Sequence, residues 1–111
     1  MSVVSSEIQN DIAVITLDNP PVNALSHALR KGFSDALNEL KADVDVKAVI
    51  IICAGRTFCA GADIKEFGKT PLSPTLPELM DKMDAFGKPL IAALHGRALG
   101  GGFELALCCH Y

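Results

Sequence analysis

The sequence predicts one α/β domain of parallel strands joined by crossover helices. Strand-like apolar runs alternate with segments of helical spacing along the whole chain. The length of 111 residues is close to the commonest size of a single domain, and no linker or low-complexity segment divides it. Two strands of one sheet that are joined through a helix usually pair in parallel. This alternation therefore predicts crossover connections.

Four segments are predicted as strands. Residues 7–10 and 11–17 come first, and the second of these, DIAVITL, has almost no polar break. Such a continuous apolar run predicts burial on both faces of the sheet. The paired prolines of the following turn force an extended path. Residues 47–54, KAVIIICA, form a third continuous, β-branched run, and 88–96, KPLIAALHG, a fourth.

Three segments are predicted as helices. Ser26 is placed to cap the first, which runs to about Ala42. Its apolar stripe is predicted from helical spacing: Leu29, Phe33, Leu37, Leu40 and Val44. Thr75 and Glu78 have the spacing of a capping box and open the second helix. One side of that helix is apolar: Leu76, Leu79, Met80, Met83 and Phe86. The third helix begins within GGGFELALCC, 100–109.

Composition and charge argue against two classes of protein. The net charge is −3 and no basic run is present, which argues against nucleic-acid binding. The longest apolar runs are too short to span a bilayer, so no membrane insertion is expected. The N-terminus has neither a basic region nor a long apolar stretch of the secretory type. A mean hydropathy of +0.31 is high for a free-standing domain and is consistent with a piece whose partner surface is missing.

The four cysteines indicate buried, reduced thiols rather than a disulfide framework. Cys53, Cys59, Cys108 and Cys109 show no C-x-x-C spacing. The adjacent pair, Cys108 and Cys109, does not fit disulfide geometry. A metal site would need the histidines to join them, and none is predicted.

Two strand-to-helix loops are built alike and carry the candidate chemistry. In each, a buried strand is followed by glycines and alanines at the point where a helix begins, in 54–67 and again in 95–107. Helix starts present unpaired N–H groups, and glycine or alanine lets a ligand oxygen approach them. Two such starts facing one another could hold one oxyanion. Glu104, one turn into the third helix, would lie near the same cleft and could hold and deprotonate a water.

Two other interpretations of these loops remain open on spacing alone. The glycines could serve only close packing of backbones, with Glu104 as a surface acid. The run GRALGGG could instead bind a phosphate. It fits neither G-x-G-x-x-G nor the Walker pattern, so a dinucleotide-binding domain is poorly supported.

Three motifs, in order and at matching separations, resemble a known family. They are PPVNALS at 20–26, FCAGADIKEF at 58–67 and KPLIAALHGRALGGGFELAL at 88–107. The chain, 1–111, is similar to the N-terminal portion of the enoyl-CoA hydratase/isomerase (crotonase) domain, a spiral of parallel strands with crossover helices. NPPVNALS and FELALCCHY resemble the hydratase end of multifunctional β-oxidation enzymes. His110, where many single-function members have Asp, favours that branch.

The resemblance implies a site made largely of backbone. The N–H groups of Ala62 and Gly101 would form the oxyanion hole for a thioester carbonyl, and Glu104 would be the first catalytic glutamate. The segment lining the coenzyme A site would be Ala62, Asp63, Ile64 and Lys65. The turn Val22, Asn23 and Ala24 would begin the pantetheine and nucleotide contacts. Pro20 replaces a basic residue of some relatives, which puts one phosphate contact in doubt. The expected substrate is an acyl-CoA thioester, with no metal or redox cofactor.

The resemblance also implies what else the activity needs. The family's second catalytic glutamate lies in a later segment of the type FGxPE, so we expect a piece of a longer enzyme with little hydratase activity alone. A Δ3–Δ2 isomerase, which can work with one carboxylate, is the nearest alternative. A non-enzymatic truncated isoform that associates with full-length subunits is another. A homo-oligomer or a downstream 3-hydroxyacyl-CoA dehydrogenase is possible, and a peroxisome is favoured over a mitochondrion or bacterial cytoplasm.

Overall fold

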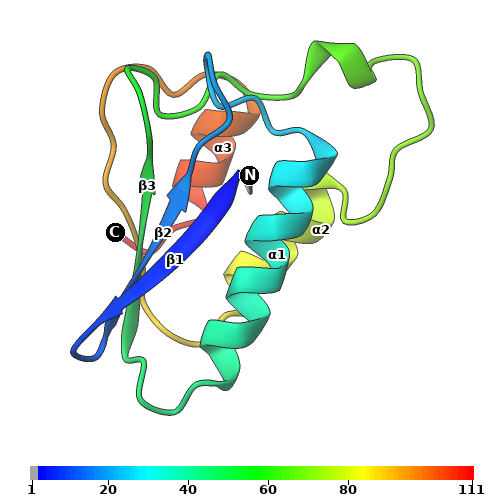
Figure 1. Cartoon of the computed structure of the whole chain (residues 1–111). Helices are drawn as coiled ribbons and strands as arrows, with labels where there is room; N and C mark the ends of the chain where they lie inside the picture. Colours follow the sequence, from blue (N-terminus) through cyan, green and yellow to red (C-terminus); the bar gives the residue numbers. More distant parts are fainter. Residues whose placement is uncertain (1–2) are drawn as a thin grey trace.

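A four-stranded mixed sheet, with strand order β1-β2-β3-β4, forms the centre of the molecule (Figure 1). The computed structural model describes residues 3–111. The strands are β1 (Val4–Gln9), β2 (Ile12–Leu17), β3 (Ala48–Cys53) and β4 (Leu90–Ala92). β2, β3 and β4 pair in parallel, as a crossover arrangement requires. The α/β class predicted from the sequence is therefore confirmed.

The first two strands depart from the parallel pattern. β1 pairs antiparallel with β2 from Val4 opposite Leu17 to Gln9 opposite Ile12. Only Asn10 and Asp11 separate the strands, and such a short turn can join antiparallel but not parallel strands. β1 also begins earlier than the predicted 7–10, because Val4 is paired and buried.

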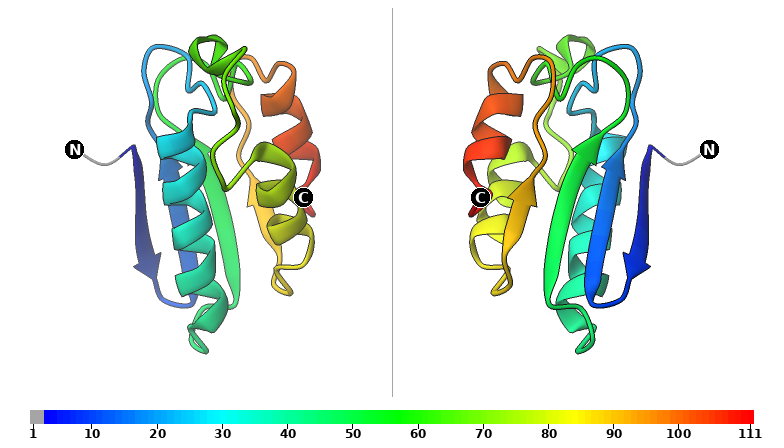
Figure 2. Two further views of the ribbon diagram at one scale, coloured as in Figure 1. Left: turned by 90° about the vertical axis from the view of Figure 1, so that its right-hand side faces the viewer. Right: turned by 90° about the vertical axis from the view of Figure 1, so that its left-hand side faces the viewer.

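The helices lie on one side of the sheet, as the two views of Figure 2 show. α1 (His27–Ala42) crosses the sheet, α2 (Leu76–Asp84) lies beside it, and α3 (Gly101–Leu107) lies toward the β4 edge. In β2 and β3 only alternate residues are therefore buried. The prediction that β2 is buried on both faces is wrong: Ile12, Val14 and Thr16 are half-buried, since no element among residues 3–111 covers their face.

α1 follows its sequence signals closely. Ser26 caps it by accepting a hydrogen bond from the Leu29 N–H, and its apolar stripe lies in the core. Val44 was predicted to belong to that stripe, but it lies beyond the end of the helix and is 81% exposed. Val46, two residues on, is buried instead.

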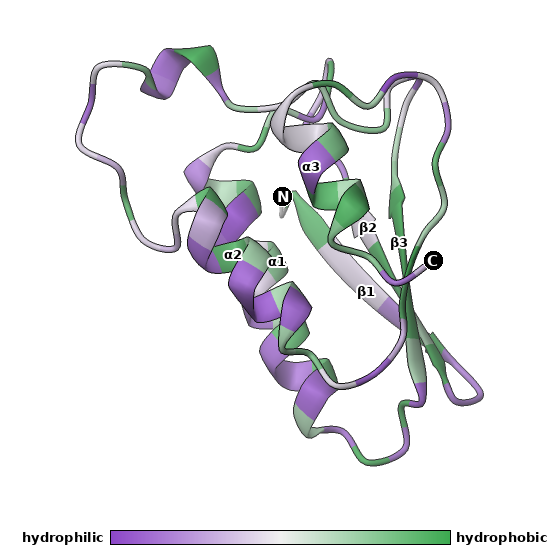
Figure 3. Cartoon of the chain, turned by 180° about the vertical axis from the view of Figure 1, so that it is seen from behind, coloured by the Kyte–Doolittle hydropathy of each residue, from purple (hydrophilic) through white to green (hydrophobic). Residues whose placement is uncertain are grey.

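The second helix begins at the predicted capping box. The Thr75 side chain accepts from the Glu78 N–H, and the Glu78 carboxylate accepts from the Thr75 N–H. Leu79 and Met83 are fully buried and belong to the core cluster that α1 and the sheet also form, whereas Met80 is half-buried. Figure 3 shows the resulting pattern, with apolar colour concentrated along β2 and β3 and polar bands on the outer sides of α1 and α2.

The loops that follow β2, β3 and β4 gather at one end of the sheet (Figure 2). They gather there because the parallel strands all run toward this end. β4 is shorter than the predicted 88–96, and its chain leaves the sheet after Ala92. None of the helices within residues 3–111 combines the length and the apolar character of a membrane-spanning segment.

Candidate active site

Three loop segments meet at this end of the sheet through backbone hydrogen bonds. The Leu25 N–H donates to the Gly61 carbonyl at 2.8 Å, and Leu25 forms a parallel bridge with Ala62. A second parallel bridge joins Cys59 to Ala98, and the Leu99 N–H donates to the Cys59 carbonyl at 2.9 Å. The turn before α1, the loop after β3 and the loop before α3 are thus held side by side.

This arrangement brings the amides of Ala62 and Gly101 together. A Cβ added to Gly101 would stand 3.7 Å from the Ala62 nitrogen. A Cβ added to Gly61 would stand 3.3 Å from the Gly101 nitrogen. Among the hydrogen bonds within residues 3–111, none is donated by either of these two amides. The predicted loops therefore place two unused backbone donors next to one another.

Glycine makes this close approach possible at two positions. Gly61 has a φ of +106°, and a side chain there would lie 3.1 Å from the Leu99 carbonyl oxygen. Gly102 is tighter still, since a Cβ would stand 2.3 Å from the Cys59 carbonyl oxygen. Any larger residue at either position would push the first turn of α3 away from the loop after β3.

Glu104 lies in the first turn of α3, three residues beyond Gly101. Its N–H donates to the Gly100 carbonyl, and its side chain is exposed. It is the acidic residue of the first turn of α3. The carboxylate is thus on the same helix as one of the two free donors.

The predicted coenzyme-contacting segment forms a short turn of 3₁₀ helix, η1 (Ile64–Glu66). Asp63 caps it by accepting from the Lys65 N–H at 3.0 Å. Ile64 is 75% exposed, and Ala62 and Lys65 are also exposed. This segment therefore presents backbone and side chains to solvent, as a ligand-contacting loop must.

Asn23 lies differently from its neighbours in the predicted turn. Val22 is 39% exposed and Ala24 is half-buried, but Asn23 is only 2% exposed. Its Nδ2 donates to the carbonyls of Ala54, Thr57 and Phe58, and its Oδ1 accepts from the Asn19 N–H. The Asn23 side chain is thus used within the protein, where it fastens the turn to the loop after β3.

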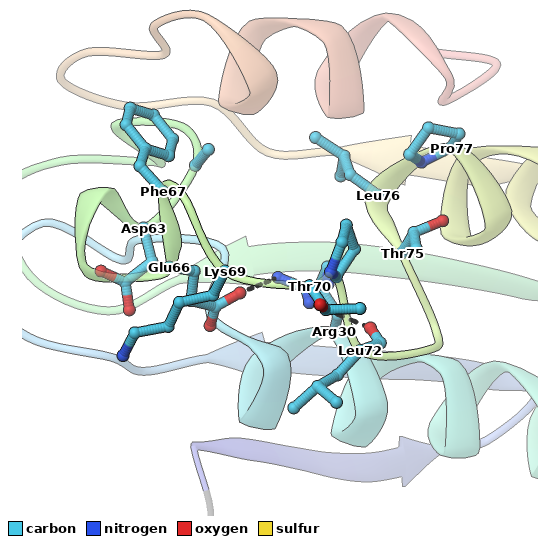
Figure 4. A pocket seen from close by; sticks show the side chains of 12 residues that line it. Arg30, Asp63, Glu66, Phe67, Lys69, Thr70, Leu72, Thr75, Leu76 and Pro77 are labelled. Carbon is cyan, nitrogen blue, oxygen red and sulfur yellow. Dashed lines mark hydrogen bonds and ion pairs between the residues drawn. The ribbon is translucent and has the colours of Figure 1, made fainter.

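A cleft of about 530 Å³ lies beside Ala62 (Figure 4). Of the predicted site residues, Ala62 and Asp63 line it, whereas Gly101 and Glu104 do not. Leu76 connects the two regions, because it lines the cleft and its Cδ2 lies 2.9 Å from the position of a Cβ on Gly101. The other walls come mainly from the loop before α2: Phe67, Lys69, Thr70, Pro71, Leu72, Thr75 and Pro77.

Two further lining residues, Arg30 and Glu66, were not singled out from the sequence. Arg30 Nη1 and Glu66 Oε1 form an ion pair at 3.0 Å (Figure 4). Burial acts to raise the pKa of the Glu66 carboxyl, but hydrogen bonds from the His27 N–H and Arg30 outweigh it and hold that pKa below its ordinary value. Arg30 directly follows Leu29, which belongs to the apolar stripe of α1. A charged residue at that position is the sequence signal that could have identified this pair.

The cysteines are free, and two of them lie close to the loops. Cys53 and Cys59 are buried, and Cys59 Sγ donates to the Asn23 carbonyl at 3.0 Å. Burial, with a smaller contribution from Cys59, raises the pKa of the Cys53 thiol to about 12. Burial likewise raises the pKa of Cys59. Cys108 and Cys109 are half-buried. Within residues 3–111 no three histidine, cysteine or acidic side chains are grouped as metal ligands.

A mixed sheet whose three parallel strands send their loops to one end defines an α/β protein. Comparison with known proteins makes the class specific. The family model for enoyl-CoA hydratase/isomerase matches residues 7–111, and the chain belongs to that family. The resemblance predicted from the three motifs is thereby confirmed.

Two curated relatives illustrate the match. The peroxisomal bifunctional enzyme of Danio rerio is 49% identical over 94% of this chain and 14% of its own length. A probable enoyl-CoA hydratase of Bacillus subtilis is 43% identical over 99% of this chain and 45% of its own length. The chain thus spans less than half the length of both relatives.

The fold comparison agrees. The crystal structure of an enoyl-CoA hydratase from Bacillus anthracis superposes with a TM-score of 0.89 at 30% identity. The superposition covers 98% of this chain and 46% of that one. Almost the whole of the described chain therefore matches a part of the crotonase fold.

Proposed function

We propose that the chain binds a 2-enoyl-CoA thioester and takes part in its hydration during fatty-acid β-oxidation. The observation that carries the proposal is the pair of adjacent, unused amides of Ala62 and Gly101. Two donors aimed at one oxygen suit a carbonyl on which negative charge develops. Family membership and relatives named as hydratases support the same reaction class.

The proposed chemistry follows from these groups. The thioester oxygen lies between the two amides, and the water oxygen bonds to C3 while Glu104 takes a proton from that water. The C2–C3 π electrons move toward the thioester and leave an enolate oxygen, which the amides stabilise. A second acid–base group then gives a proton to C2, and the carbonyl is restored. Each amide is expected to contribute about 3 kcal/mol to the transition state.

Other parts of the site have supporting roles in this proposal. Residues 62–65 contact coenzyme A, and the turn at 22–24 contacts it through Val22 and the backbone. Coenzyme A enters as part of the substrate, and the reaction calls for no metal or redox cofactor. The apolar wall of the cleft, which includes Phe67, Leu72 and Leu76, receives part of the ligand.

Hydration also calls for a second acid–base group. Of the two carboxylates that line the cleft, Asp63 caps η1 and Glu66 is paired with Arg30. Among the acidic side chains of the described site, Glu104 is thus the one that makes no hydrogen bond or ion pair within the protein. We therefore expect binding and carbonyl polarisation by the 111 residues, with hydratase turnover far below that of a longer relative.

The isomerase alternative rests on the same observation, because moving a double bond requires one carboxylate to shuttle a proton. Product analysis separates the two reactions: a hydratase converts a 2-enoyl thioester to a 3-hydroxyacyl thioester, whereas an isomerase converts a 3-enoyl thioester to its conjugated isomer. Association with full-length subunits would instead appear as co-elution with a longer relative during size exclusion.

Compartment and assembly are proposed from the relatives. Several relatives of this chain are named peroxisomal bifunctional or multifunctional enzymes, which favours a peroxisomal setting and a partner dehydrogenase domain. The Bacillus subtilis relative, which is 43% identical to this chain, is named without reference to a peroxisome. Homo-oligomerisation is a further proposal, tested by sedimentation of the purified chain.

A direct test removes the Gly101 donor, with a ring carbon in place of the amide hydrogen. Proline is tolerated at the first position of a helix and lacks an N–H, so Gly101→Pro deletes the donor. Its extra carbon would approach Leu76, so the variant is made in a Leu76→Ala background and compared with Leu76→Ala alone. We expect about 100-fold weaker binding of an enolate-like acyl-CoA in the double variant. Equal affinity in the two proteins would contradict the proposal.

A further inference from the structure

The Arg30 guanidinium is buried and bonded to three separate segments of the chain. Its side chain is 8% exposed. Nη1 donates to the Leu25 carbonyl at 2.7 Å and to Glu66 Oε1 at 3.0 Å. Nε donates to the Pro74 carbonyl at 2.8 Å, and Nη2 to the Leu72 carbonyl at 3.3 Å. One side chain of α1 thus ties together the turn before the helix, η1 and the loop before α2.

Glu66 completes this connection from the other side. Its Oε1 accepts from Arg30, and its Oε2 accepts from the His27 N–H at 2.8 Å. The carboxylate therefore fixes η1 to the first turn of α1. A charge-assisted bond and a bond to a helix start both favour its ionised form.

The segments that Arg30 holds are those that surround the two free amides. The Leu25 N–H bonds to Gly61, beside Ala62, and Leu25 Cδ1 lies 3.4 Å from the position of a Cβ on Gly101. Pro74 is two residues from Leu76, whose Cδ2 also lies against Gly101. Movement of either segment would therefore change the spacing between the two donors.

We propose that Arg30 and Glu66 are a positioning pair that sets the separation of the Ala62 and Gly101 amides. This inference rests on the proposed function, since the amides are positioned for a thioester oxygen. Arg30 acts through the Leu25 carbonyl and through the loop at 72–74, while Glu66 acts through η1. Neither residue forms or breaks a bond of the substrate.

The geometry requires arginine rather than any cation. A planar guanidinium presents several donors in fixed directions, whereas a lysine ammonium is a compact charge on a flexible stem. Arg30→Lys therefore keeps the charge near Glu66 and loses most of the carbonyl bonds. Glu66→Gln keeps the shape and an acceptor for the His27 N–H but removes the charge. The exposed pair Lys31 and Asp35, at 3.0 Å on the same helix, supplies the matched control Lys31→Gln.

The first test uses a conjugated dienoyl-CoA as an optical probe. Hydrogen bonds to its carbonyl draw electron density along the conjugated chain and shift its absorption to longer wavelength. At saturating probe, we expect a smaller shift for Arg30→Lys than for the wild-type chain, with affinity about tenfold weaker. Lys31→Gln should match the wild type within about twofold. If the pair served only stability, Arg30→Lys would lower the melting temperature and leave the absorption shift of the saturated probe as large as in the wild type. That result would overturn the inference.

The second test needs no ligand and so remains decisive if the proposed function fails. Amide resonances of Ala62 and Gly101 are compared by ¹⁵N-resolved NMR in the wild-type chain, Glu66→Gln and Lys31→Gln. We expect both resonances to move in Glu66→Gln and neither to move in the control. Glu66→Gln also serves if Arg30→Lys does not fold. If neither amide resonance moved in Glu66→Gln, the positioning role would be overturned. If the wild-type chain produced no absorption shift of the dienoyl-CoA, only the proposed polarisation of acyl-CoA would be contradicted.

Discussion

The Gly101 nitrogen lies 3.3 Å from the point at which a side chain on Gly61 would begin. This relationship joins two glycines that are forty positions apart in the sequence: Gly61 shortly precedes η1, and α3 begins at Gly101. It depends on the absence of a side chain at Gly61 and on the backbone bridges that hold both loops.

Gly61→Ala should destabilise the chain by about 1–3 kcal/mol more than Gly55→Ala, because only the first substitution adds an overpacked contact. Both glycines have a positive φ, but a Cβ on Gly55 meets nothing within 4 Å. Urea unfolding of the two variants measures the difference. Equal free energies of unfolding would show that the approach of α3 to Gly61 is looser than described.

Asn23→Asp should destabilise the chain by about 3 kcal/mol or more, because the buried carboxylate oxygen that replaces Nδ2 would face three carbonyl oxygens and have no hydrogen to donate to them. Asn38→Asp is the matched control, since Asn38 is exposed and accepts from Lys82 Nζ at 2.8 Å. Thermal unfolding should separate the variants clearly. A similar melting temperature for both would contradict the scaffold role of Asn23.

Stability should fall in acid as Glu66 and Glu78 take up protons. Burial opposes the shift at Glu66, but the bonds from His27 and Arg30 hold its pKa below the ordinary value of 4.5. The bonds from the Thr75 N–H and hydroxyl, and from Ser73, lower the pKa of Glu78. A lowered folded-state pKa means that the stabilisation is present above pH 4.5 and is lost as the pH falls through the folded value.

The measurement is the free energy of unfolding as a function of pH. Below pH 4.5 the wild-type curve should fall more steeply than that of Glu66→Gln, and the double variant with Glu78→Gln should be flatter still. Above that pH the curves should be parallel. A Glu66→Gln curve as steep as the wild type would show that the Arg30 pair does not stabilise the ionised carboxylate.

The buried thiols should react slowly with an alkylating reagent in the folded protein. Burial raises the pKa of Cys53 to about 12 and, with a contribution from Cys108, that of Cys109 to about 11, so very little thiolate is present near neutral pH. Cys108 is less buried and should be modified first, although burial and nearby carboxylates also raise its pKa. Mass spectrometry of timed samples gives the order, and urea should make all four sites reactive. Early modification of Cys53 in the folded chain would contradict its placement.

Local signals explain which parts of the fold could be predicted. The caps Ser26 and Thr75 act within one turn, so their sequence spacing was sufficient to locate α1 and α2. The one-sided cover of the sheet depends on where distant helices pack, and a continuous apolar run such as β2 does not encode it. Val44 shows the same limit, because helical spacing continued past the residue at which the helix ends.

The candidate site likewise has parts that local sequence signals predict and parts that they do not. Glycine-rich helix starts predicted the loops that carry Ala62 and Gly101, and their convergence follows from parallel strands ending at one edge. The Arg30–Glu66 pair joins side chains 36 positions apart, and no local rule pairs them. Asn23 was predicted within a ligand-contacting turn, but its bonds to three carbonyls are formed only when the loop after β3 folds over it.

We propose that the amides of Ala62 and Gly101 jointly hold a thioester oxygen. The most direct measurement follows both amide resonances of the ¹⁵N-labelled chain during titration with an enolate-forming acyl-CoA. We expect the two resonances to move downfield together and to saturate at one ligand per chain. Binding that moves neither resonance, or only one of them, would contradict it.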